Sequence, residues 1–386
     1  MCKNCAPRNP IHCIVPPYMV NKIIENTPGK GMAFKKSVST MYDDAVFRKK
    51  RSMLTCMDTA EMDSVLEMIN VDKGLIARNV TKAVATKAVA AGKHKVKAVV
   101  KPLREVYTAN NKRVLSGKLV RKEGQPPVAD KDVNRVYDAA GDTWQMYYSI
   151  FDRNSIDGKG MKIIQSVHYG IGYENAFWDG KQMVYGDGGE VFSSFTKDID
   201  IIGHELSHGV VQYEANLTYL GQSGAINEHM ADVFGMLVRQ FTNKETAKKS
   251  NWLIGQNTFR QKGYALRSMK KPGKAYINHP ILGTDPQPGH MDNYQNLAPN
   301  DDDGGVHINS GIPNRAFFLT AYNLGGNAWE KAGKIWYCAL CDPTQLNADS
   351  QFVDLKAATI YCAEKLYGIN SKEKIQVVNA WNEVGV

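Results

Sequence analysis

The amino-acid sequence predicts an α+β fold with a mainly β N-terminal lobe, a mainly α C-terminal lobe and a cleft between them. The chain has 386 residues, of which 43% are hydrophobic and 23% charged, a composition typical of globular proteins and a length too great for one ordinary hydrophobic core. Residues 103–195 contain short β-type segments separated by Gly, Asn and Asp. After Asp198 the apolar residues recur with helical spacing as far as Val386.

The predicted organisation has three parts. These are a leader with a basic linker at residues 1–102, the β-rich lobe at 103–203 and the helical lobe at 204–386. The leader contains a helical pattern at 63–69 and a basic cluster at Arg48–Arg51. Its last part, about 77–102, is rich in Ala, Val and Lys and has no acidic or aromatic residue, so we expect a solvated, protease-accessible linker.

The net charge of +9 belongs to the leader alone. Residues 1–100 contain 17 Lys/Arg and 8 Asp/Glu, whereas the rest of the chain has 31 of each. No nucleic-acid-binding motif accompanies this excess, so we expect no nucleic-acid partner. A nucleic-acid or membrane-associated protein that uses the basic leader stays open as an alternative, and salt-dependent retention on heparin of the full chain, but not of residues 103–386, would support it.

Targeting signals are weak in this sequence. No apolar run approaches the ~20 residues of a membrane-spanning helix, so we expect no transmembrane segment. The N-terminus, MCKNCAPRNPIHCIVPPYMV, has charged, polar and proline residues where the apolar core of a signal peptide would lie. We therefore expect no signal peptide, synthesis in the cytoplasm, and a non-classical route for any export to the outside of the cell.

Seven cysteines argue against a disulfide framework, because the number is odd and the chain is long. Four lie in the leader, and the others are Cys338, Cys341 and Cys362. Cys338 and Cys341 have a C-x-x-C spacing in a helical segment, which we interpret as buried reduced thiols because no further metal ligands are evident nearby.

A metal-binding motif, H-E-x-x-H, occupies residues 204–208. On a helix, His204 and His208 lie one turn apart on the same face, so both imidazoles can reach one zinc ion. Glu205 lies next to the first ligand and can accept a proton from a water molecule held at the metal. The other face of this helix is apolar, which predicts a core helix rather than a surface helix with two chance histidines.

A second helical segment supplies the carboxylate that this motif requires. Glu228 follows His208 by twenty positions, and two His plus one Glu leave one position of a tetrahedral zinc open, as in catalytic sites. Asp232 lies one turn further on the same face, where it can accept a hydrogen bond from the second ring nitrogen of a ligand histidine. His229 points away from that face and is interpreted as a bystander.

A Gly-rich turn carries a third histidine. His307 follows Asp302 by five residues, within the segment DDGGVHINSG. Together with a zinc site, such a histidine can donate a hydrogen bond to the oxyanion that forms when water attacks a peptide carbonyl.

Seven blocks of sequence between residues 103 and 386 resemble the thermolysin family of metallopeptidases, in the family's order. The blocks are 175–178 (NAFW), 183–188 (MVYGDG), 204–208 (HELSH), 223–228 (SGAINE), 265–269 (ALRSM), 304–312 (GGVHINSGI) and 380–386 (AWNEVGV). This resemblance implies a zinc-dependent neutral endopeptidase of peptide and protein substrates, cutting before bulky hydrophobic residues, with one catalytic Zn²⁺.

The resemblance also implies roles for individual residues. His204, His208 and Glu228 would bind zinc, with Asp232 and Asn227 as partners of the ligands, and Glu205 would be general base and proton shuttle. Tyr219 and His307 would stabilise the oxyanion, with Asp302 orienting His307. Asn175, the Ala176 carbonyl and Arg267 would hold the substrate backbone, with Arg267 on the carbonyl just beyond the scissile bond. The apolar pocket would be formed by Phe192, Phe195, Ile201 and Leu266.

The leader is similar to the short propeptides of the protealysin branch of the family. The similarity lies in Pro16-Pro17-Tyr18, within IVPPYMV, and it implies an intramolecular inhibitor that lies against the cleft in a self-processing precursor. Three leader cysteines, with Cys13 three residues before Pro16, leave open a latch in which a thiolate binds zinc. A catalytically inactive binding protein on this fold is a further alternative, although Glu205, Tyr219, His307 and Arg267 are all present.

The sequence departs from the family at its paired calcium site. Of the carboxylates that this site needs, the resemblance leaves only Asp200, and the other matching positions are Arg239, Asn251, Leu253 and Gln256. A hard cation needs several oxygen ligands, so we expect this calcium site to be lost and Arg239 to pair with Asp200 instead.

Overall fold

The computed structural model describes residues 12–26, 40 and 100–386. The predicted features at 48–51, 63–69 and 77–99, and also Cys2, Cys5 and Cys56, lie outside these residues. The described leader residues belong to the same compact unit as residues 102–386.

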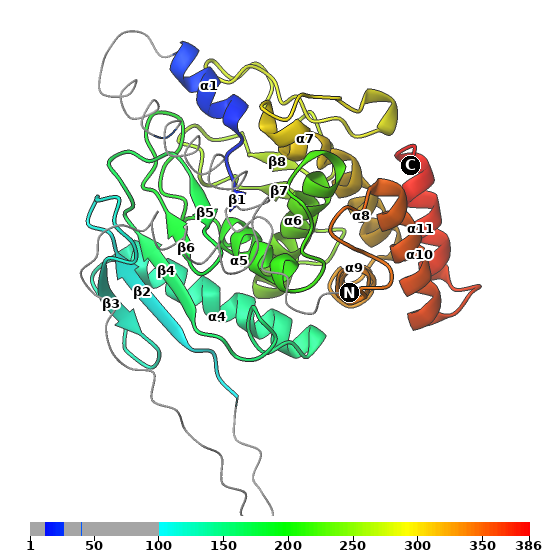
Figure 1. The fold of residues 1–386 in the computed structure, drawn as a ribbon, viewed down its shortest axis with the longest axis horizontal. Helices are drawn as coiled ribbons and strands as arrows, with labels where there is room; N and C mark the ends of the chain where they lie inside the picture. Colours follow the sequence, from blue (N-terminus) through cyan, green and yellow to red (C-terminus); the bar gives the residue numbers. More distant parts are fainter. Residues whose placement is uncertain (1–11, 27–39, 41–99) are drawn as a thin grey trace, which may run out of the picture. The chain divides into compact units, whose positions relative to one another are not determined.

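A six-stranded mixed sheet forms the N-terminal lobe (Figure 1). Its strands are β1 (His12–Cys13), β2 (Arg104–Thr108), β3 (Lys118–Lys122), β4 (Ile163–Val167), β5 (Ala176–Trp178) and β6 (Met183–Tyr185). The order across the sheet is β1-β5-β6-β4-β2-β3. The pairs β2–β4 and β4–β6 are parallel and the others antiparallel. The leader therefore contributes one edge strand, next to β5.

A long helix, α4 (Lys131–Phe151), packs against β2 and β4 of this lobe. The prediction of β-type structure throughout residues 103–195 missed it. The helix begins at an N-cap, Asp130, whose carboxylate accepts hydrogen bonds from the backbone N–H groups of Asp132 at 2.9 Å and Val133 at 3.3 Å. Its buried side chains recur with helical spacing, so the signal for this helix was present in the sequence.

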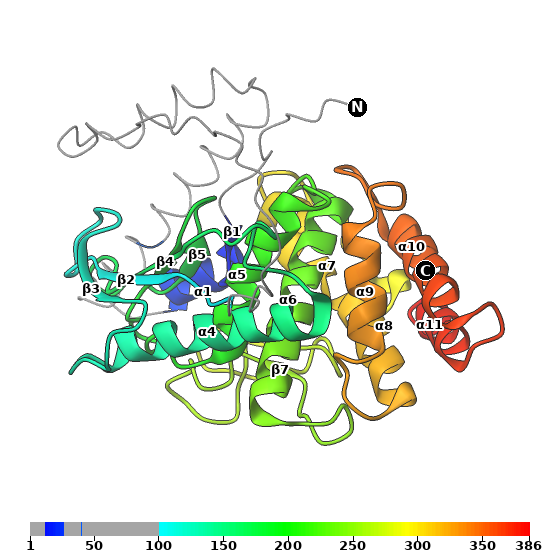
Figure 2. The same cartoon turned by 90° about the horizontal axis from the view of Figure 1, so that it is seen from below.

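Helices dominate the rest of the chain, which confirms the α+β class with a helical C-terminal lobe. They are α5 (Ile199–Tyr213), α6 (Gly221–Asn243), α7 (Asp302–Asn309), α8 (Gly311–Leu324), α9 (Ala332–Cys341), α10 (Phe352–Tyr367) and α11 (Lys372–Glu383). A two-stranded sheet, β7 (Leu253–Ile254) with β8 (Arg267–Ser268), and a 3₁₀ helix, η1 (Met291–Asn293), lie between α6 and α7 in the chain. Figure 2 shows α9, α10 and α11 on the side of α6 away from the six-stranded sheet. The predicted lobe boundary at 203/204 falls inside α5.

Helices α5 and α6 approach each other unusually closely through two glycines. A Cβ atom at Gly235 would lie 2.4 Å from the Asp200 carbonyl oxygen and 2.8 Å from the His204 backbone nitrogen. A Cβ at Gly203 would lie 3.1 Å from the Gly235 Cα. Because backbone atoms cannot move aside as a side chain can, only glycine permits this contact. It brings the H-E-x-x-H helix directly against the helix that carries Glu228.

The helix α1 (Pro17–Asn26) continues the leader beyond β1. Its first residue is a proline, which suits the first helical position because no N–H is needed there. Met19, Val20 and Ile23 are fully buried, and the Asn26 side-chain amide donates a hydrogen bond to the Ile281 carbonyl at 2.8 Å. This part of the leader therefore packs on the body through an apolar face.

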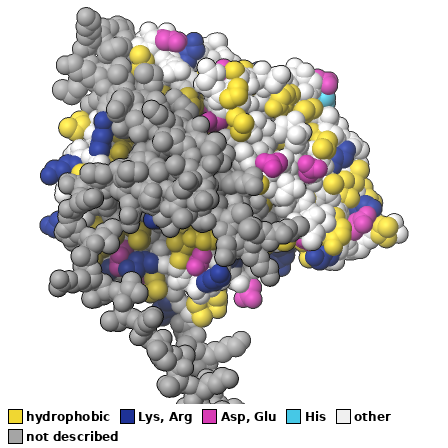
Figure 3. Space-filling view, in the orientation of Figure 1, with side chains coloured by type: hydrophobic (Ala, Val, Ile, Leu, Met, Phe, Trp, Pro, Cys, Tyr) yellow, Lys and Arg dark blue, Asp and Glu magenta, His cyan; other side chains and the backbone are white. Residues whose placement is uncertain are grey.

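Lys/Arg and Asp/Glu side chains are interspersed on the described surface visible in Figure 3. Within the described ranges, no helix combines the length and apolar character that a membrane crossing requires.

Candidate metal centre and catalytic site

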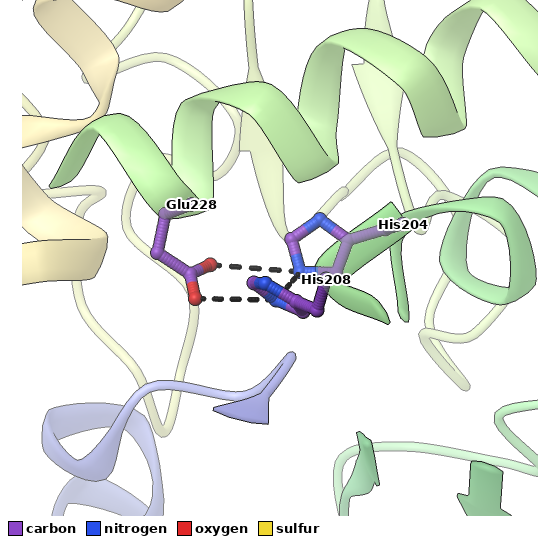
Figure 4. Close-up of side chains that lie close together, drawn as sticks. All are labelled: His204, His208 and Glu228. Atoms are coloured by element: carbon purple, nitrogen blue, oxygen red, sulfur yellow. Dashed lines mark hydrogen bonds and ion pairs between the residues drawn. The ribbon is translucent and has the colours of Figure 1, made fainter. Parts of the chain in front are cut away.

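Two imidazoles and one carboxylate converge between α5 and α6 (Figure 4). The Nε2 atoms of His204 and His208 lie 2.9 Å apart. The carboxylate of Glu228 lies 3.5 Å from the Nε2 atom of His204 and 3.4 Å from that of His208. All three side chains are completely buried.

The other ring nitrogen of each histidine faces an oxygen acceptor. The Nδ1 atom of His204 lies 2.8 Å from Asp232 Oδ1, and that of His208 lies 2.8 Å from Asn227 Oδ1. Each Nδ1 must therefore carry the proton, which leaves both Nε2 lone pairs directed at one point beside a carboxylate. Without a cation between them, the two lone pairs and the carboxylate repel one another. Two His plus one Glu is the donor set of a catalytic zinc ion. The residues present fit zinc.

Asp232 has two further partners. Arg267 donates from Nε and Nη2 to its two oxygens, each at 2.8 Å, and the Asn314 amide donates to Oδ2 at 2.8 Å. Burial raises the pKa of this carboxyl, but Arg267 and His204 outweigh burial, and the pKa lies well below its usual range. Asp232 is thus held ionised, ready to fix the His204 ring. Asn314 was not predicted from the sequence.

His229 takes no part in this cluster. Its Nδ1 lies 2.8 Å from Asn314 Oδ1, and the Trp336 indole N–H donates to its Nε2 at 2.7 Å. Burial lowers its pKa to about 4, so the ring is neutral. The interpretation of His229 as a bystander is confirmed.

Glu205 is completely buried beside the two histidines. Within the described part of the chain, neither of its carboxylate oxygens has a well-formed hydrogen bond. Burial and then the charge of Glu228 raise its pKa well above the usual value, while Arg267 and the backbone N–H groups of Trp178 and Ile14 oppose the shift only partly. A carboxylate in this state has a high affinity for a proton.

His307 lies beside Glu228, in α7, with its Nε2 atom 3.6 Å from the Glu228 carboxylate. Asp302 Oδ1 lies 2.6 Å from its Nδ1, and Asp302 Oδ2 accepts from its backbone N–H at 2.9 Å. The Tyr219 hydroxyl lies 3.2 Å from His307 Nε2 and donates to Glu228. Burial lowers the pKa of His307, but Glu228 and Asp302 outweigh burial and raise it to about 9. The structure thus brings His307, Asp302 and Tyr219 together as expected.

The predicted substrate-binding residues line the path of the leader. Asn175 and Ala176 stand at the start of β5, Arg267 stands in β8, and all three hydrogen-bond to the backbone of Ile14 or Val15. The predicted pocket residues, Phe192, Phe195, Ile201 and Leu266, are fully buried in the hydrophobic cluster that also contains Ile14.

The predicted leader motif lies where α1 begins. Pro16 is buried, and its carbonyl accepts from the Met19 N–H at 3.1 Å. Pro17 opens the helix. The Tyr18 hydroxyl lies beside Tyr276, and burial followed by that neighbour raises its pKa well above the usual value.

A zinc latch by the Cys13 thiolate is contradicted. Side chains of a strand alternate between faces, and in β1 it is His12 that faces the metal centre, with its ring stacked on His208 at a centroid distance of 4.4 Å. Cys13 packs on the opposite side with Phe177, Tyr173 and Val184. The position of His12 was not predicted from the sequence.

The C-terminal cysteines are only partly as expected. None of Cys338, Cys341 and Cys362 forms a disulfide, but only Cys362 is fully buried and the other two are half-buried. None of the three belongs to a metal-capable group among the described residues.

The Asp200–Arg239 ion pair is confirmed. Arg239 Nη1 lies 3.3 Å from Asp200 Oδ2 and donates to the Leu253 carbonyl at 2.7 Å, and Nη2 donates to Asn251 Oδ1 at 2.6 Å. The guanidinium thus connects α5, α6 and β7.

Comparison with known proteins identifies the family. Residues 71–212 match the thermolysin metallopeptidase catalytic domain, and residues 215–386 match the thermolysin metallopeptidase alpha-helical domain. Protease PrtS of Photorhabdus sp. (strain Az29) is 49% identical over 286 residues, which cover 73% of this chain and 76% of that protein. The extracellular metalloprotease of Pectobacterium carotovorum subsp. carotovorum is 46% identical over 286 residues, with 73% and 81% covered.

A solved structure extends the similarity to the leader. The precursor of protealysin, a metalloproteinase from Serratia proteamaculans, has a TM-score of 0.75 and 41% sequence identity, and the match covers 97% of this chain and 99% of that chain. Together with the geometry of the metal centre, these matches show that the chain belongs to the thermolysin family of metallopeptidases and is a metalloendopeptidase.

Proposed function

We propose that this protein is a zinc-dependent neutral endopeptidase that hydrolyses peptide bonds on the N-terminal side of bulky hydrophobic residues and is made as a self-processing precursor. The observation that carries the proposal is the convergence of two histidine lone pairs and one carboxylate beside Glu205, a buried carboxylate without a well-formed hydrogen bond among the described residues.

In this proposal His204, His208 and Glu228 hold zinc, with Asp232 and Asn227 orienting the two imidazoles. When bound, zinc supplies a Lewis acid that polarises a peptide carbonyl and makes water more acidic. Glu205 accepts the proton of the attacking water and passes it to the leaving nitrogen. Its buried position and raised pKa suit a group that must take up and return a proton.

The charge that develops on the carbonyl oxygen has two donors in this proposal. His307 and Tyr219 donate to it, and Asp302 keeps the Nδ1 proton of His307 in place so that Nε2–H points into the cleft. Removing one donor of this kind typically costs ~10²–10³ in kcat.

Two residues at the start of β5 and one arginine bind the substrate in this proposal. Asn175, Ala176 and Arg267 hold the substrate backbone, while Phe192, Phe195, Ile201 and Leu266 form the apolar pocket for the side chain after the scissile bond. Apolar pockets discriminate by only ~1–3 kcal/mol per methylene, so the specificity is broad.

The leader, residues 1–102, acts in this proposal as an intramolecular inhibitor of the catalytic part, which consists of lobes 103–203 and 204–386. The support is that Asn175, Arg267 and His307, three residues assigned to substrate, hydrogen-bond to leader residues 13–15. While the leader lies there, the cleft cannot take another segment.

Removal of the leader requires a cut in the linker, and we expect it between about Lys95 and Leu103. Lys95–Val96, Ala98–Val99 and Val99–Val100 place an apolar residue after the bond, and the side chains of Val100 and Leu103 are exposed. Because the leader fills the molecule's own cleft, this cut is made by a second molecule and its rate should rise with protein concentration. N-terminal sequencing of the mature form checks the position, and a cut at Arg48–Arg51 would instead indicate a trypsin-like enzyme.

We propose that the mature protein acts outside the cell after non-classical export. The support is that the similar protein from Pectobacterium carotovorum is an extracellular metalloprotease by name.

Casein hydrolysis by the purified protein, with and without 1,10-phenanthroline, tests the central proposal. We expect hydrolysis that the chelator abolishes and added zinc restores. Zinc-loaded, leader-free protein that leaves casein intact would favour the inactive binding protein instead.

A further inference from the structure

The leader runs through the site as an added edge strand with a defined register. Strand β1 pairs antiparallel with β5, with Cys13 opposite Phe177, and the Ile14 N–H donates to the Ala176 carbonyl at 3.1 Å. An extended segment that joins a sheet edge is held by its backbone, so each of its peptide groups has a fixed partner. These partners show which bond of the leader faces the catalytic groups.

The carbonyl contacts give the first indication of the register. His307 Nε2 lies 2.7 Å from the Cys13 carbonyl oxygen, and the Tyr219 hydroxyl lies 3.2 Å from the same Nε2. The carbonyl that faces His307, one of the two proposed oxyanion donors, is therefore that of Cys13.

Contacts on the other side of the bond give the same register independently. Arg267 Nη1 donates to the Ile14 carbonyl at 3.0 Å, and the Asn175 side chain accepts from the Val15 N–H at 2.9 Å and donates to the Val15 carbonyl at 3.2 Å. Arg267 is the residue assigned to the carbonyl just beyond the scissile bond. Its partner here is Ile14, so the bond before it is Cys13–Ile14.

The remaining features of this bond are those of a substrate. Ile14 is a bulky apolar residue, is fully buried and belongs to the main hydrophobic core, which also contains the four proposed pocket residues.

We propose that the Cys13–Ile14 peptide bond occupies the position of the scissile bond and is hydrolysed by the chain's own active site once zinc is bound. The inference rests on the proposed function. Water adds its hydroxyl to the Cys13 carbonyl carbon, the C–N bond breaks, and the Ile14 nitrogen receives the proton. The products are residues 1–13, ending in a Cys13 carboxylate, and a chain that begins with the Ile14 amino group.

This cut does not by itself release the leader. The contacts of Ile14 and Val15 with Arg267 and Asn175 all lie after the bond, as do the buried face of α1 and the Asn26–Ile281 hydrogen bond. The cut leader therefore stays in the cleft, and activation still requires the cut in the linker.

The test uses the full chain, purified without metal and then given one equivalent of zinc. Mass spectrometry and N-terminal sequencing should reveal a new N-terminus at Ile14, formed at a rate that does not change over about a hundredfold range of protein concentration. Ile14→Leu should keep the cut, because the pocket still receives a bulky apolar side chain, whereas Ile14→Gly should slow it at least about tenfold. A ¹⁵N-labelled Glu205→Gln chain mixed with the wild type should keep its own Cys13–Ile14 bond, since its own cleft covers that bond.

The outcomes separate this inference from the proposed function. Zinc-loaded protein that hydrolyses casein but forms no Ile14 N-terminus overturns the inference alone. A rate that rises with concentration, or cutting of the labelled Glu205→Gln chain at this bond, also overturns it. Failure to cleave either casein or the leader overturns both proposals.

Discussion

The two candidate histidine ligands could be predicted at the level of single residues because local helix geometry brings them together. Positions i and i+4 share a helix face, so His204 and His208 converge in any helix. Asp232 could be placed by the same rule relative to Glu228. Asn314 and His12 could not be predicted, because only the folded chain brings them to the site. Asn314 lies 82 residues after its partner Asp232, and His12 lies 196 residues before its partner His208. The only signal for His12 in the sequence was weak: in a short strand, side chains alternate between the two faces, so His12 and Cys13 point to opposite sides.

His168 gives a prediction for the dependence of stability on pH. Its ring nitrogens lie 2.8 Å from Asp187 and 2.9 Å from Asp130, the N-cap of α4. The bond to Asp187 outweighs the opposite effect of burial and, with Asp130, raises its pKa to about 9. Since the unfolded value is ~6.5, the stabilisation is complete below about pH 6.5 and is lost as the pH rises through about 9.

The variant His168→Asn tests this expectation, because Asn tolerates the positive φ of 57° at this position. The melting temperature of the wild type should exceed that of the variant by a few degrees at pH 6, and the difference should shrink steadily up to pH 10. A difference that is constant across this range would contradict the assignment.

At the scale of elements, the close approach of α5 and α6 determines the metal centre. Gly235→Ala places a methyl group against two backbone atoms of α5, which cannot rotate away. We expect a loss of ~1–3 kcal/mol in unfolding free energy and weaker zinc binding, because His204 moves relative to Glu228. Gly333→Ala is the matched control, since its methyl group would meet the mobile end of Leu237 at 2.8 Å, the Ala328 carbonyl at 3.3 Å and the Phe151 ring at 3.7 Å. Equal zinc affinity of the two variants in a competition titration would argue against this role of Gly235.

The ion pair between α5 and α6 leads to a prediction about calcium. The resemblance to the family predicts a calcium-binding carboxylate at the position of Arg239, and in this structure Arg239 connects three elements through Asp200, Leu253 and Asn251. We expect the melting temperature to respond strongly to removal of zinc and hardly at all to millimolar calcium. Arg239→Leu leaves Asp200 buried and without its cationic partner, and should lower the unfolding free energy by ~3–5 kcal/mol. Arg239→Lys keeps the charge but not the several N–H donors of the guanidinium group, and should lower it by less. Calorimetry decides, and a rise of many degrees on adding calcium would contradict the loss of the site.

The elements themselves were predicted unevenly. The strands near residues 104, 118 and 163 and the helices after Asp198 followed from hydrophobic periodicity. The helix α4 was missed because β-type segments lie on either side of it and the whole lobe was predicted to be β-rich. The N-cap residue Asp130 and the spacing of the apolar residues in α4 nevertheless indicate a helix. The boundary at 203/204 cut α5 because the first turn of that helix precedes the H-E-x-x-H motif.

At the scale of the whole molecule, one edge of the sheet serves two roles. Strand β5 presents its edge to the leader in this structure, and in the proposed mechanism the same edge presents a substrate to the same catalytic groups. The register of the leader could not be predicted from the sequence, because it depends on contacts across 160 residues to Asn175 and 253 residues to Arg267. The similarity to short propeptides predicted only that the leader lies in the cleft.

The central claim is that Glu205 is the general base of a zinc peptidase whose ligands are His204, His208 and Glu228. The most direct test compares the wild type with Glu205→Gln in zinc content and in casein hydrolysis, on zinc-loaded, leader-free protein. Because glutamine keeps the shape but cannot accept a proton, the variant should hold one zinc per chain, as the wild type does, and lose a factor of ~10²–10⁴ in kcat. Loss of the metal from Glu205→Gln, or activity within about tenfold of the wild type, would contradict the account.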